Sequence, residues 1–236
     1  HMGAVADAAA ARAGIDRAAQ DEFAIRSYQL AQRSIEAGIF DEEIVPVRKK
    51  ARKGEEVVAR DEEPYRVELA RLPQLRPAFT EGGTVTAGNA STLNDGAAIA
   101  LLASGDAVRS LKLAPKARLV ATATHSMAPD HFTDAPVGAI EAVCRRAGLK
   151  LAEIDLFEIN EAFALVPLIA IRELRLPPEK VNPNGGAVAI GHPIGASGAR
   201  LAATVVHELR RRGLRYGLAT LCIGGGEAVA AIFERV

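Results

Sequence analysis

The sequence predicts an α/β fold, and three features of its 236 residues lead to this prediction. From about residue 84 onward, short strand-like runs alternate with longer helix-prone segments, which is the pattern of a sheet covered by helices. Glycines and prolines stand where these helices would end and begin. Hydrophobic residues make up 49% of the chain, which is enough for a sizeable core at this length.

Composition and charge exclude several classes of protein. Lysines and arginines number 29, as do aspartates and glutamates, so no net basic field attracts nucleic acid. No apolar run approaches the roughly 18–20 residues of a membrane-spanning helix, so we expect no membrane contact. The two cysteines cannot form a disulfide framework, which favours a reducing, cytoplasmic location.

The first third of the chain predicts two helices. An alanine-rich segment at 3–14 is helix-prone and ends at Gly14. Asp16 is a favoured N-cap for a second helix, which Gly38 ends. One face of this second helix collects residues at helical spacing, namely Phe23, Ser27, Leu30, Ser34 and Ala37.

The segment that follows has a different character. We expect a short strand at 44–47, a turn at 61–64 and a short helix at 69–75. A basic run at 48–53 precedes two glutamates. Such a run is usually a solvated surface, and a patch that faces phosphate is the alternative.

The remaining elements alternate until a final pair of antiparallel strands. Helices are expected at 95–103, 136–147, 161–174 and 198–212, and strands at 119–124, 156–159, 218–222 and 228–233. Pro136 stands in the first turn of its helix, where proline is favoured. Three glycines, Gly224 to Gly226, join the last two strands as a tight turn.

Asn160 stands where a strand turns into a helix, in the segment Asn160-Glu161-Ala162-Phe163-Ala164. Open α/β sheets bind ligands at the carboxyl ends of their strands, so this amide is placed to hold a water molecule or a substrate oxygen. The alternative is that Asn160 caps the helix. Taken alone, the cap is the simpler interpretation.

His192 lies in a glycine-rich segment between Asn184 and Arg200. Five glycines in this segment allow the backbone to approach a ligand closely. The spacing matches neither the dinucleotide-binding fingerprint nor the P-loop. Between Gly191 and Pro193, the imidazole stands on a rigid loop, which suits a general base or an oxyanion donor.

Cys222 ends a predicted strand and is followed after one residue by three glycines. A thiol beside free backbone N–H groups can transfer a proton next to an oxyanion hole. The alternative is a buried core cysteine. Cys144 lies inside a predicted helix without polar company, and we interpret it as a core residue.

A histidine, a cysteine and a glycine-rich pocket favour acyl transfer through a thioester, or removal of a proton beside a thioester carbonyl. The segments Gly191-His192-Pro193 and Cys222-Ile223-Gly224-Gly225-Gly226 resemble the active-site motifs of the thiolases. Further similar segments are His1-Met2-Gly3, 20–24, 40–47 and 83–96, so the resemblance covers the whole chain. The implied fold is α/β and thiolase-like, with a C-terminal α/β domain plus a loop domain.

The resemblance implies a role for each polar group. His192 would activate the nucleophile and donate to the thioester oxygen, and Asn160 would hold the water that completes this first oxyanion hole. Cys222 would take the α-proton of the incoming acetyl group, while the Gly224 N–H serves a second hole. A coenzyme A thioester would be the substrate, with no metal and no separate cofactor.

The resemblance also implies a binding tunnel for the pantetheine arm of coenzyme A. Its lining residues would be His1, Met2, Ser91, Ala162 and Phe163. Arg66 would lie near the adenine end.

The sequence departs from the family in its cysteines. Thiolases carry a nucleophilic cysteine on their N-terminal domain, and neither Cys144 nor Cys222 matches its setting. We therefore expect a C-terminal portion that lacks the N-terminal domain. The expected parts are the loop domain at 1–92, a helix at 93–114 that returns to the absent domain, and the C-terminal α/β domain at 115–236.

Three functions follow from the resemblance. The first is an acetyl-CoA acetyltransferase that condenses two acetyl-CoA or cleaves acetoacetyl-CoA, with its nucleophile on the missing part. The second is a longer-chain 3-ketoacyl-CoA thiolase, because Phe132-Thr133-Asp134-Ala135-Pro136 stands where many short-chain thiolases carry Met-Gly-Thr-Gly-Pro. The third is a non-catalytic acyl-CoA-binding subunit. We expect a homo-oligomer or a bound N-terminal fragment, since the apolar side chains at 93–103 need a covering surface.

Overall fold

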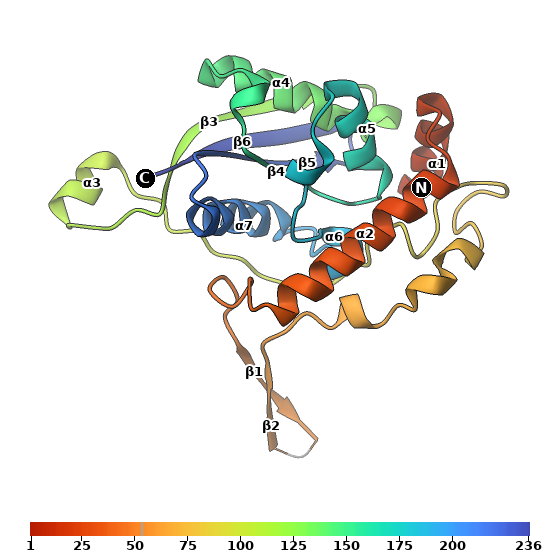
Figure 1. The fold of residues 1–236 in the computed structure, drawn as a ribbon, viewed down its shortest axis with the longest axis horizontal. Helices are drawn as coiled ribbons and strands as arrows, with labels where there is room; N and C mark the ends of the chain where they lie inside the picture. Colours follow the sequence, from red (N-terminus) through yellow and green to blue (C-terminus); the bar gives the residue numbers. More distant parts are fainter. Residues whose placement is uncertain (53) are drawn as a thin grey trace.

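The computed structural model describes residues 1–52 and 54–236. Its centre is a four-stranded sheet with the order β3-β6-β5-β4 (Figure 1). The strands are β3 (Ala117–Ser126), β4 (Leu156–Ile159), β5 (Tyr216–Ile223) and β6 (Glu227–Arg235). β4 runs parallel to β5, whereas β3 and β5 are antiparallel to β6. These strands and the glycine-closed hairpin between the last two confirm the prediction.

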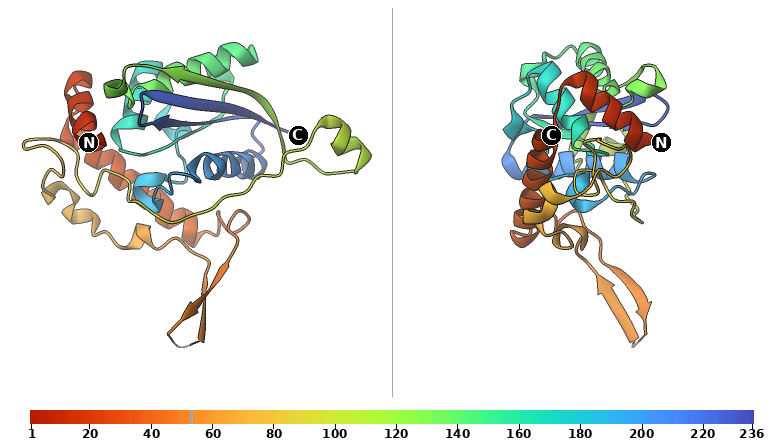
Figure 2. Two further views of the ribbon diagram at one scale, coloured as in Figure 1. Left: turned by 180° about the vertical axis from the view of Figure 1, so that it is seen from behind. Right: turned by 90° about the vertical axis from the view of Figure 1, so that its right-hand side faces the viewer.

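Helices cover both faces of the sheet (Figures 1 and 2). α4 (Ala135–Ala147) lies on one face with α5 (Leu165–Leu174) beside it, and α7 (Ser197–Arg212) lies on the other. Both faces are sealed by buried side chains of α4 and α7: Ala139, Ile140, Val143, Leu201, Val205 and Leu209. Burial of each larger side chain in this set stabilises the fold by roughly 1.5–3 kcal/mol.

The two predicted N-terminal helices are present as α1 (Met2–Ala13) and α2 (Arg17–Glu36). Gly14 ends α1 in the left-handed conformation, and Asp16 caps α2 by accepting a hydrogen bond from Ala19 N at 2.9 Å. α2 lies against the short helix α6 (Ala187–Ile190) and the 3-10 helix η2 (Leu69–Gln74). A helix from the first third of the chain therefore reaches the segment that leads to His192.

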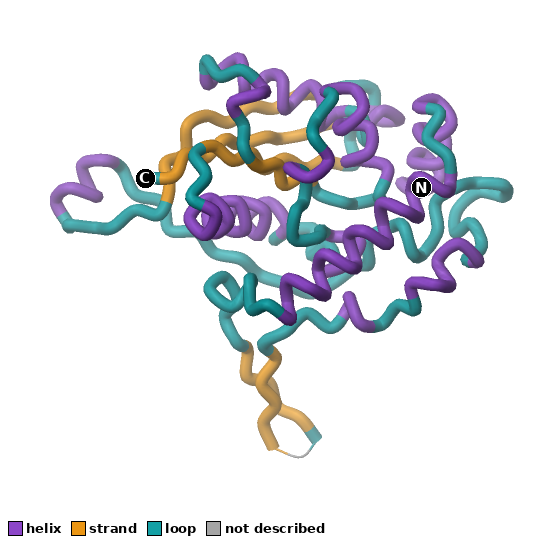
Figure 3. Tube along the Cα trace, viewed as in Figure 1, coloured by secondary structure: helices purple, strands orange, loops and turns teal. Residues whose placement is uncertain are grey.

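Short 3-10 helices connect the larger elements (Figure 3). Besides η2, they are η1 (Glu63–Tyr65), η3 (Pro129–His131), η4 (Leu151–Glu153) and η5 (Pro178–Lys180). The helix expected at 69–75 is confirmed as η2. Among the residues described, no helix combines the length and the apolarity that a membrane span requires.

The strand expected at 44–47 is misplaced. The structure has instead a two-stranded arm, β1 (Val47–Ala51) and β2 (Gly54–Val58), which projects from the body of the protein (Figure 1). Cross-strand ion pairs favour this register, since Arg48 lies 3.6 Å from Glu55 and Lys49 lies 3.3 Å from Glu56. The basic run thus faces acidic partners in solvent, as the solvated-surface interpretation expects. Its last residue, Lys53, lies outside the described residues.

The helix expected within 93–114 is mostly absent. Residues 93–103 form no helix, and only α3 (Gly105–Ser110) is helical, where Ser104 Oγ accepts from Ala107 N at 3.1 Å. An apolar helix needs a surface to bury its side chains, and this segment has none: Ile99 and Leu101 are 93% and 90% exposed. The exposure expected for these residues is confirmed.

The helix expected from residue 161 begins four residues later, at Leu165. The backbone before it is bound elsewhere, because Ala164 N donates to Asn89 O at 2.8 Å and Phe163 forms a bridge with Ala90. Residues 160–164 are therefore held outside the helix. They lie at the carboxyl edge of the sheet.

Candidate active site

Asn160 and Cys222 lie at the ends of neighbouring parallel strands, β4 and β5, at one edge of the sheet. Ile159 of β4 pairs with Thr220 of β5, and Asn160 N donates to Thr220 O at 2.9 Å. Both residues therefore follow closely after this last register pair. His192 joins them from another loop, with its Nε2 3.2 Å from Asn160 Nδ2. The side chains of Asn160 and His192 thus meet at the edge where open sheets bind ligands, and Cys222 lies near the same edge on β5.

The loop before His192 is fixed by its backbone. Gly191 has φ 91°, and a Cβ there would stand 2.2 Å from Asn94 Oδ1, so only glycine fits without a shift. The His192 N–H lies within hydrogen-bond distance of Thr92 O (3.1 Å) and Asn94 Oδ1 (3.2 Å). The imidazole is consequently attached to a rigid loop, as the sequence predicted.

The surroundings of His192 select its tautomer. Ser197 Oγ donates to Pro193 O at 3.1 Å, so the same oxygen accepts from His192 Nδ1 at 2.6 Å. Nδ1 therefore carries the proton, and Nε2 presents its lone pair toward the Asn160 amide. Burial lowers the pKa of His192, and the nearby Arg200 charge lowers it further. A neutral imidazole with a free lone pair can act as a base.

The side chain of Asn160 is fully buried and does not cap a helix. The cap interpretation is wrong because α5 begins only at Leu165, after Ala164. The Asn160 amide nitrogen faces His192, whereas Oδ1 accepts no hydrogen bond from the described residues. A buried acceptor of this kind is suited to a water or a ligand donor.

Cys222 is a buried thiol at the end of β5. Burial raises the pKa of this thiol to about 12, so the neutral form predominates at physiological pH. Close beyond it, a Cβ on Gly224 would stand 3.2 Å from Met2 Sδ. Cys144 is buried on α4, which confirms the prediction of a core residue.

Most of the predicted substrate-binding residues lie together. Ser91 donates to Ala162 O through both its N–H and its Oγ, each at 3.1 Å. The ring of His1 lies 4.7 Å from that of Phe79, which is itself 6.3 Å from Phe163. Sequence reasoning missed Phe79, which no nearby motif marks.

Two further observations bear on the predicted binding residues. Phe132 lies 6.2 Å from Phe163, which connects the 132–136 segment to this aromatic row. Arg66 is exposed and forms ion pairs with its neighbours Glu62 and Glu63. The structure does not bring Arg66 into contact with the other predicted residues that it describes.

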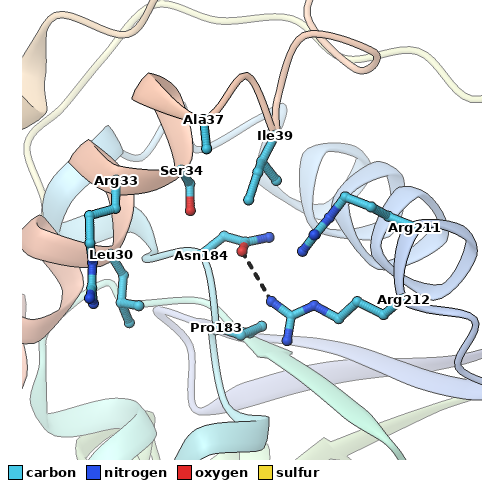
Figure 4. A pocket seen from close by; sticks show the side chains of 9 residues that line it. All are labelled: Leu30, Arg33, Ser34, Ala37, Ile39, Pro183, Asn184, Arg211 and Arg212. Atoms are coloured by element: carbon cyan, nitrogen blue, oxygen red, sulfur yellow. Dashed lines mark hydrogen bonds between the residues drawn. The ribbon is translucent and has the colours of Figure 1, made fainter.

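A separate cavity of about 510 Å³ lies between α2 and α7 (Figure 4). Two of its lining residues bind each other, since Arg212 donates to Asn184 Oδ1 at 3.2 Å, and Arg211 and Arg212 both pair with Glu208 beside it. None of the predicted catalytic residues lines it. Across residues 1–52 and 54–236, no three His, Cys, Asp or Glu side chains form a metal-binding group.

Two family models match the chain. The model of the thiolase C-terminal domain matches residues 113–235, and that of the thiolase N-terminal domain matches residues 1–106. The expectation that the chain lacks the N-terminal domain is therefore wrong, because sequence of that domain makes up the first 106 residues.

Similar proteins are acyltransferases by name. The chain is 49% identical to a probable acetyl-CoA acyltransferase of Staphylococcus aureus strain COL, over 100% of this chain and 60% of that protein. The crystal structure of the Bacillus anthracis acetyl-CoA acetyltransferase matches with a TM-score of 0.97 at 43% identity, over 100% of this chain and 60% of that one. The crystal structure of human mitochondrial 3-ketoacyl-CoA thiolase matches with a TM-score of 0.92 at 39% identity, over 100% of this chain and 60% of that one. The chain thus spans about 60% of the length of these relatives.

Proposed function

The chain belongs to the thiolase family, and from this premise we propose that it carries the proton-transfer part of an acyl-coenzyme A acyltransferase site. The observation that carries the proposal is the contact of His192 with Asn160 at the sheet edge near which Cys222 also lies. Asn160 Nδ2 lies 3.2 Å from His192 Nε2, and Cys222 is the penultimate residue of β5, the strand parallel to β4. The substrate is an acyl-coenzyme A thioester, and the chemistry is carbon–carbon bond formation or thiolytic cleavage.

His192 acts first as a base in this proposal. Its neutral ring presents the Nε2 lone pair, which takes the proton of an attacking thiol. The imidazolium then donates from Nε2 to the thioester oxygen as negative charge develops there. Asn160 Oδ1, buried and without a protein donor in the described residues, orients a water that completes this first oxyanion hole.

Cys222 moves the α-proton in this proposal. The raised pKa keeps the thiol protonated, so in the cleavage direction it is ready to donate a proton to the departing enolate carbon. In the condensation direction the same sulfur first gives its proton to the coenzyme A thiolate that acylation releases, and as a thiolate it then takes the α-proton of the second acetyl-CoA. The Gly224 N–H stabilises the enolate oxygen, and the contact with Met2 leaves little room for a side chain at that glycine.

The pantetheine arm lies along the row formed by His1, Met2, Ser91, Ala162 and Phe163. The paired contacts of Ser91 with Ala162 and the aromatic contacts of His1 and Phe163 through Phe79 support this path. Arg66 at the adenine end stays a prediction. Its exposed guanidinium must exchange Glu62 and Glu63 for a phosphate to act there.

The acyl group is carried by a nucleophile from outside these 236 residues. Cys144 is enclosed in α4, and Cys222 is assigned to proton transfer. We therefore expect the 236-residue chain alone to release no acetyl-CoA from acetoacetyl-CoA and coenzyme A. An enzyme that includes this chain together with the nucleophile, called the complete enzyme below, should release acetyl-CoA. Cleavage by the verified chain alone would assign the nucleophile to Cys222 and overturn this division of roles.

The acyl chain is short in the leading form of the proposal, because the similar Bacillus anthracis structure is named an acetyl-CoA acetyltransferase. A longer chain is the second candidate, since Phe132 approaches Phe163 where the acyl pocket is expected. Thiolysis by the complete enzyme of a series of 3-ketoacyl-CoA substrates, from acetoacetyl-CoA to long-chain ones, separates the two. The largest kcat/KM for acetoacetyl-CoA supports the acetyl-transferring form. Coenzyme A binding without any turnover would leave only an acyl-CoA-binding subunit.

We also propose a cytoplasmic, oligomeric protein. The exposed apolar side chains Ile99, Leu101 and Leu102 favour a covering surface from another copy. Sedimentation of the complete enzyme, with Leu101→Asp as the variant, tests this. A wild-type monomer would contradict it.

A further inference from the structure

Glu161 is a fully buried carboxylate that stands next to Asn160 and faces other partners. It accepts hydrogen bonds from Ser27 Oγ at 2.7 Å, Asn182 Nδ2 at 2.8 Å and Val188 N at 3.1 Å. Ser27 Oγ in turn accepts from Gly186 N at 2.9 Å. One closed network therefore joins helix α2, the end of β4 and the loop that leads to His192.

The loop lies directly on helix α2 in this network. Gly185 has φ 83°, and a Cβ there would stand 2.5 Å from Ser27 O and 2.7 Å from Ala31 N. A Cβ on Gly186 would stand 2.4 Å from the Glu161 carboxyl carbon. These contacts leave no space for a side chain, so the two glycines let the loop backbone reach both the helix and the carboxylate.

Asn182 extends the same network to the other catalytic segment. Its Oδ1 accepts from Ile159 N, and its Nδ2 donates to Ile159 O, both at 2.8 Å. Ile159 immediately precedes Asn160. Through Asn182, Glu161 thus holds the backbone just before Asn160. Through Val188, it holds the backbone of the segment that leads to His192.

We propose that Glu161 and Ser27 are positioning residues, which fix the His192 loop on helix α2 and so set the 3.2 Å approach between His192 and Asn160. This inference rests on the proposed role of His192. Nothing in the network touches the reacting atoms, so its effect on the reaction passes through the orientation of the imidazole. The N-terminal third of the chain thereby determines the geometry of a residue 165 positions beyond Ser27.

Burial raises the pKa of Glu161, whereas the hydrogen bonds from Ser27, Asn182 and Val188 act against this shift and favour the carboxylate, because each of these partners donates. A carboxylate has acceptors only, whereas the side-chain amide of a Glu161→Gln variant would turn its NH₂ toward Ser27 and Val188 or toward Asn182. Either orientation sets a donor against a donor. Loss of the Ser27 hydroxyl removes the tie to α2 and leaves Gly186 N without its acceptor.

The test uses the complete enzyme with three variants. Ser27→Ala and Glu161→Gln break the network. Ser34→Ala is the matched control, since Ser34 lies on the same helix, is 4% exposed against 1% for Ser27, and makes no hydrogen bond to Glu161 or Gly186 in the described structure. The readouts are kcat and KM for acetoacetyl-CoA, hydrogen exchange at Gly186 and Val188, the imidazole nitrogen signals of His192, and the melting temperature.

We expect Ser27→Ala to lower kcat about tenfold or more with KM changed less than about twofold, to speed exchange at Gly186, and to alter the His192 tautomer signals. Ser34→Ala should leave all of these unchanged. Wild-type kcat and His192 signals in Ser27→Ala, with only a lower melting temperature, would overturn the proposal. Should Glu161→Gln fail to fold, Ser27→Ala decides alone.

The outcome is separable from that of the proposed function. If His192→Ala keeps full activity, the proposed role of His192 fails. The exchange and imidazole measurements still report whether Ser27 and Glu161 hold the loop.

Discussion

The buried carboxylate of Glu158 on β4 lies 3.5 Å from the guanidinium of Arg200 on α7, and this is an incomplete pairing. One oxygen of Glu158 makes this contact, while Oε1 has no hydrogen-bond partner among the described residues. Burial raises the pKa of Glu158 to about 8, against the opposing effect of Arg200. A charge so poorly compensated makes the stability of the fold depend on pH.

We predict that the protein becomes less stable as pH rises from about 4.5 to 8. Unfolded Glu158 loses its proton near 4.5, whereas the folded carboxyl keeps it to about 8, so each pH unit in this window favours unfolding. The total is roughly 4–5 kcal/mol for this group. The free energy of unfolding, measured with urea at pH 5, 6.5 and 8, should fall less steeply with pH for Glu158→Gln than for wild type. Some slope remains, because burial also raises the pKa of Glu43 to about 7.

Glu141→Gln is the control for this measurement. The carboxylate of Glu141 is exposed on α4, 3.9 Å from Arg145. The unfolding free energy of the variant should therefore change with pH as it does in wild type. An unchanged slope in Glu158→Gln would show that this carboxyl does not titrate as proposed.

Ser197→Ala should slow the reaction by releasing the tautomer of His192. The serine accepts from Nδ1 at 2.6 Å, so without it either ring nitrogen can carry the proton. We expect kcat to fall about tenfold to a hundredfold in the complete enzyme, with KM for acetoacetyl-CoA nearly unchanged. Nitrogen NMR of the imidazole shows the tautomer directly. A kcat equal to that of wild type would mean that Asn160 and the loop suffice.

His192→Ala should impair both halves of the reaction. In the proposed function the imidazole takes the proton of the nucleophile and then donates to the oxyanion, and one oxyanion donor is worth roughly 3 kcal/mol or more. We expect a burst of acylation by acetyl-CoA to disappear together with condensation. An unchanged acylation burst in the variant would restrict His192 to a role in condensation.

Local signals in the sequence predicted most of the sheet and its helices. Asp16 and Gly14 are a helix cap and a helix stop that act within a few residues, and both are found where expected. The converging motifs around His192 and Cys222 were likewise recognisable, because each carries its own glycines. The parallel pairing of β4 and β5 places Asn160 and Cys222 at the same edge of the sheet, and His192 contacts Asn160 there.

Features that depend on distant partners could not be predicted in this way. Glu161 and Ser27 are 134 positions apart, and neither residue has a local pattern that reveals the other. In the sequence Asn160 resembles a helix cap. In the structure the helix begins only after Ala164, whose N–H donates to the distant residue Asn89. The segment at 95–103 has the composition of a helix but lacks a surface to bury it, and composition alone does not report that.

The last prediction concerns Cys222, which the proposal assigns to moving the α-proton and not to carrying the acyl group. In the complete enzyme, Cys222→Ala should still accept an acetyl group from acetyl-CoA onto the separate nucleophile. It should lose condensation and cleavage about 10²–10⁴-fold, as expected when a positioned acid or base is removed. Acetyl incorporation and acetoacetyl-CoA formation, measured side by side, give both quantities.

Cys144→Ala provides the matched control, because it removes the other buried thiol, on α4 and away from the sheet edge. It should retain both activities and lose only stability, by about 1 kcal/mol. If Cys222 were a packing residue alone, its alanine variant would behave in the same way. Survival of both activities in Cys222→Ala would therefore overturn the assigned role. Loss of condensation with retained acetylation would show that Cys222 serves proton transfer and not acyl transfer.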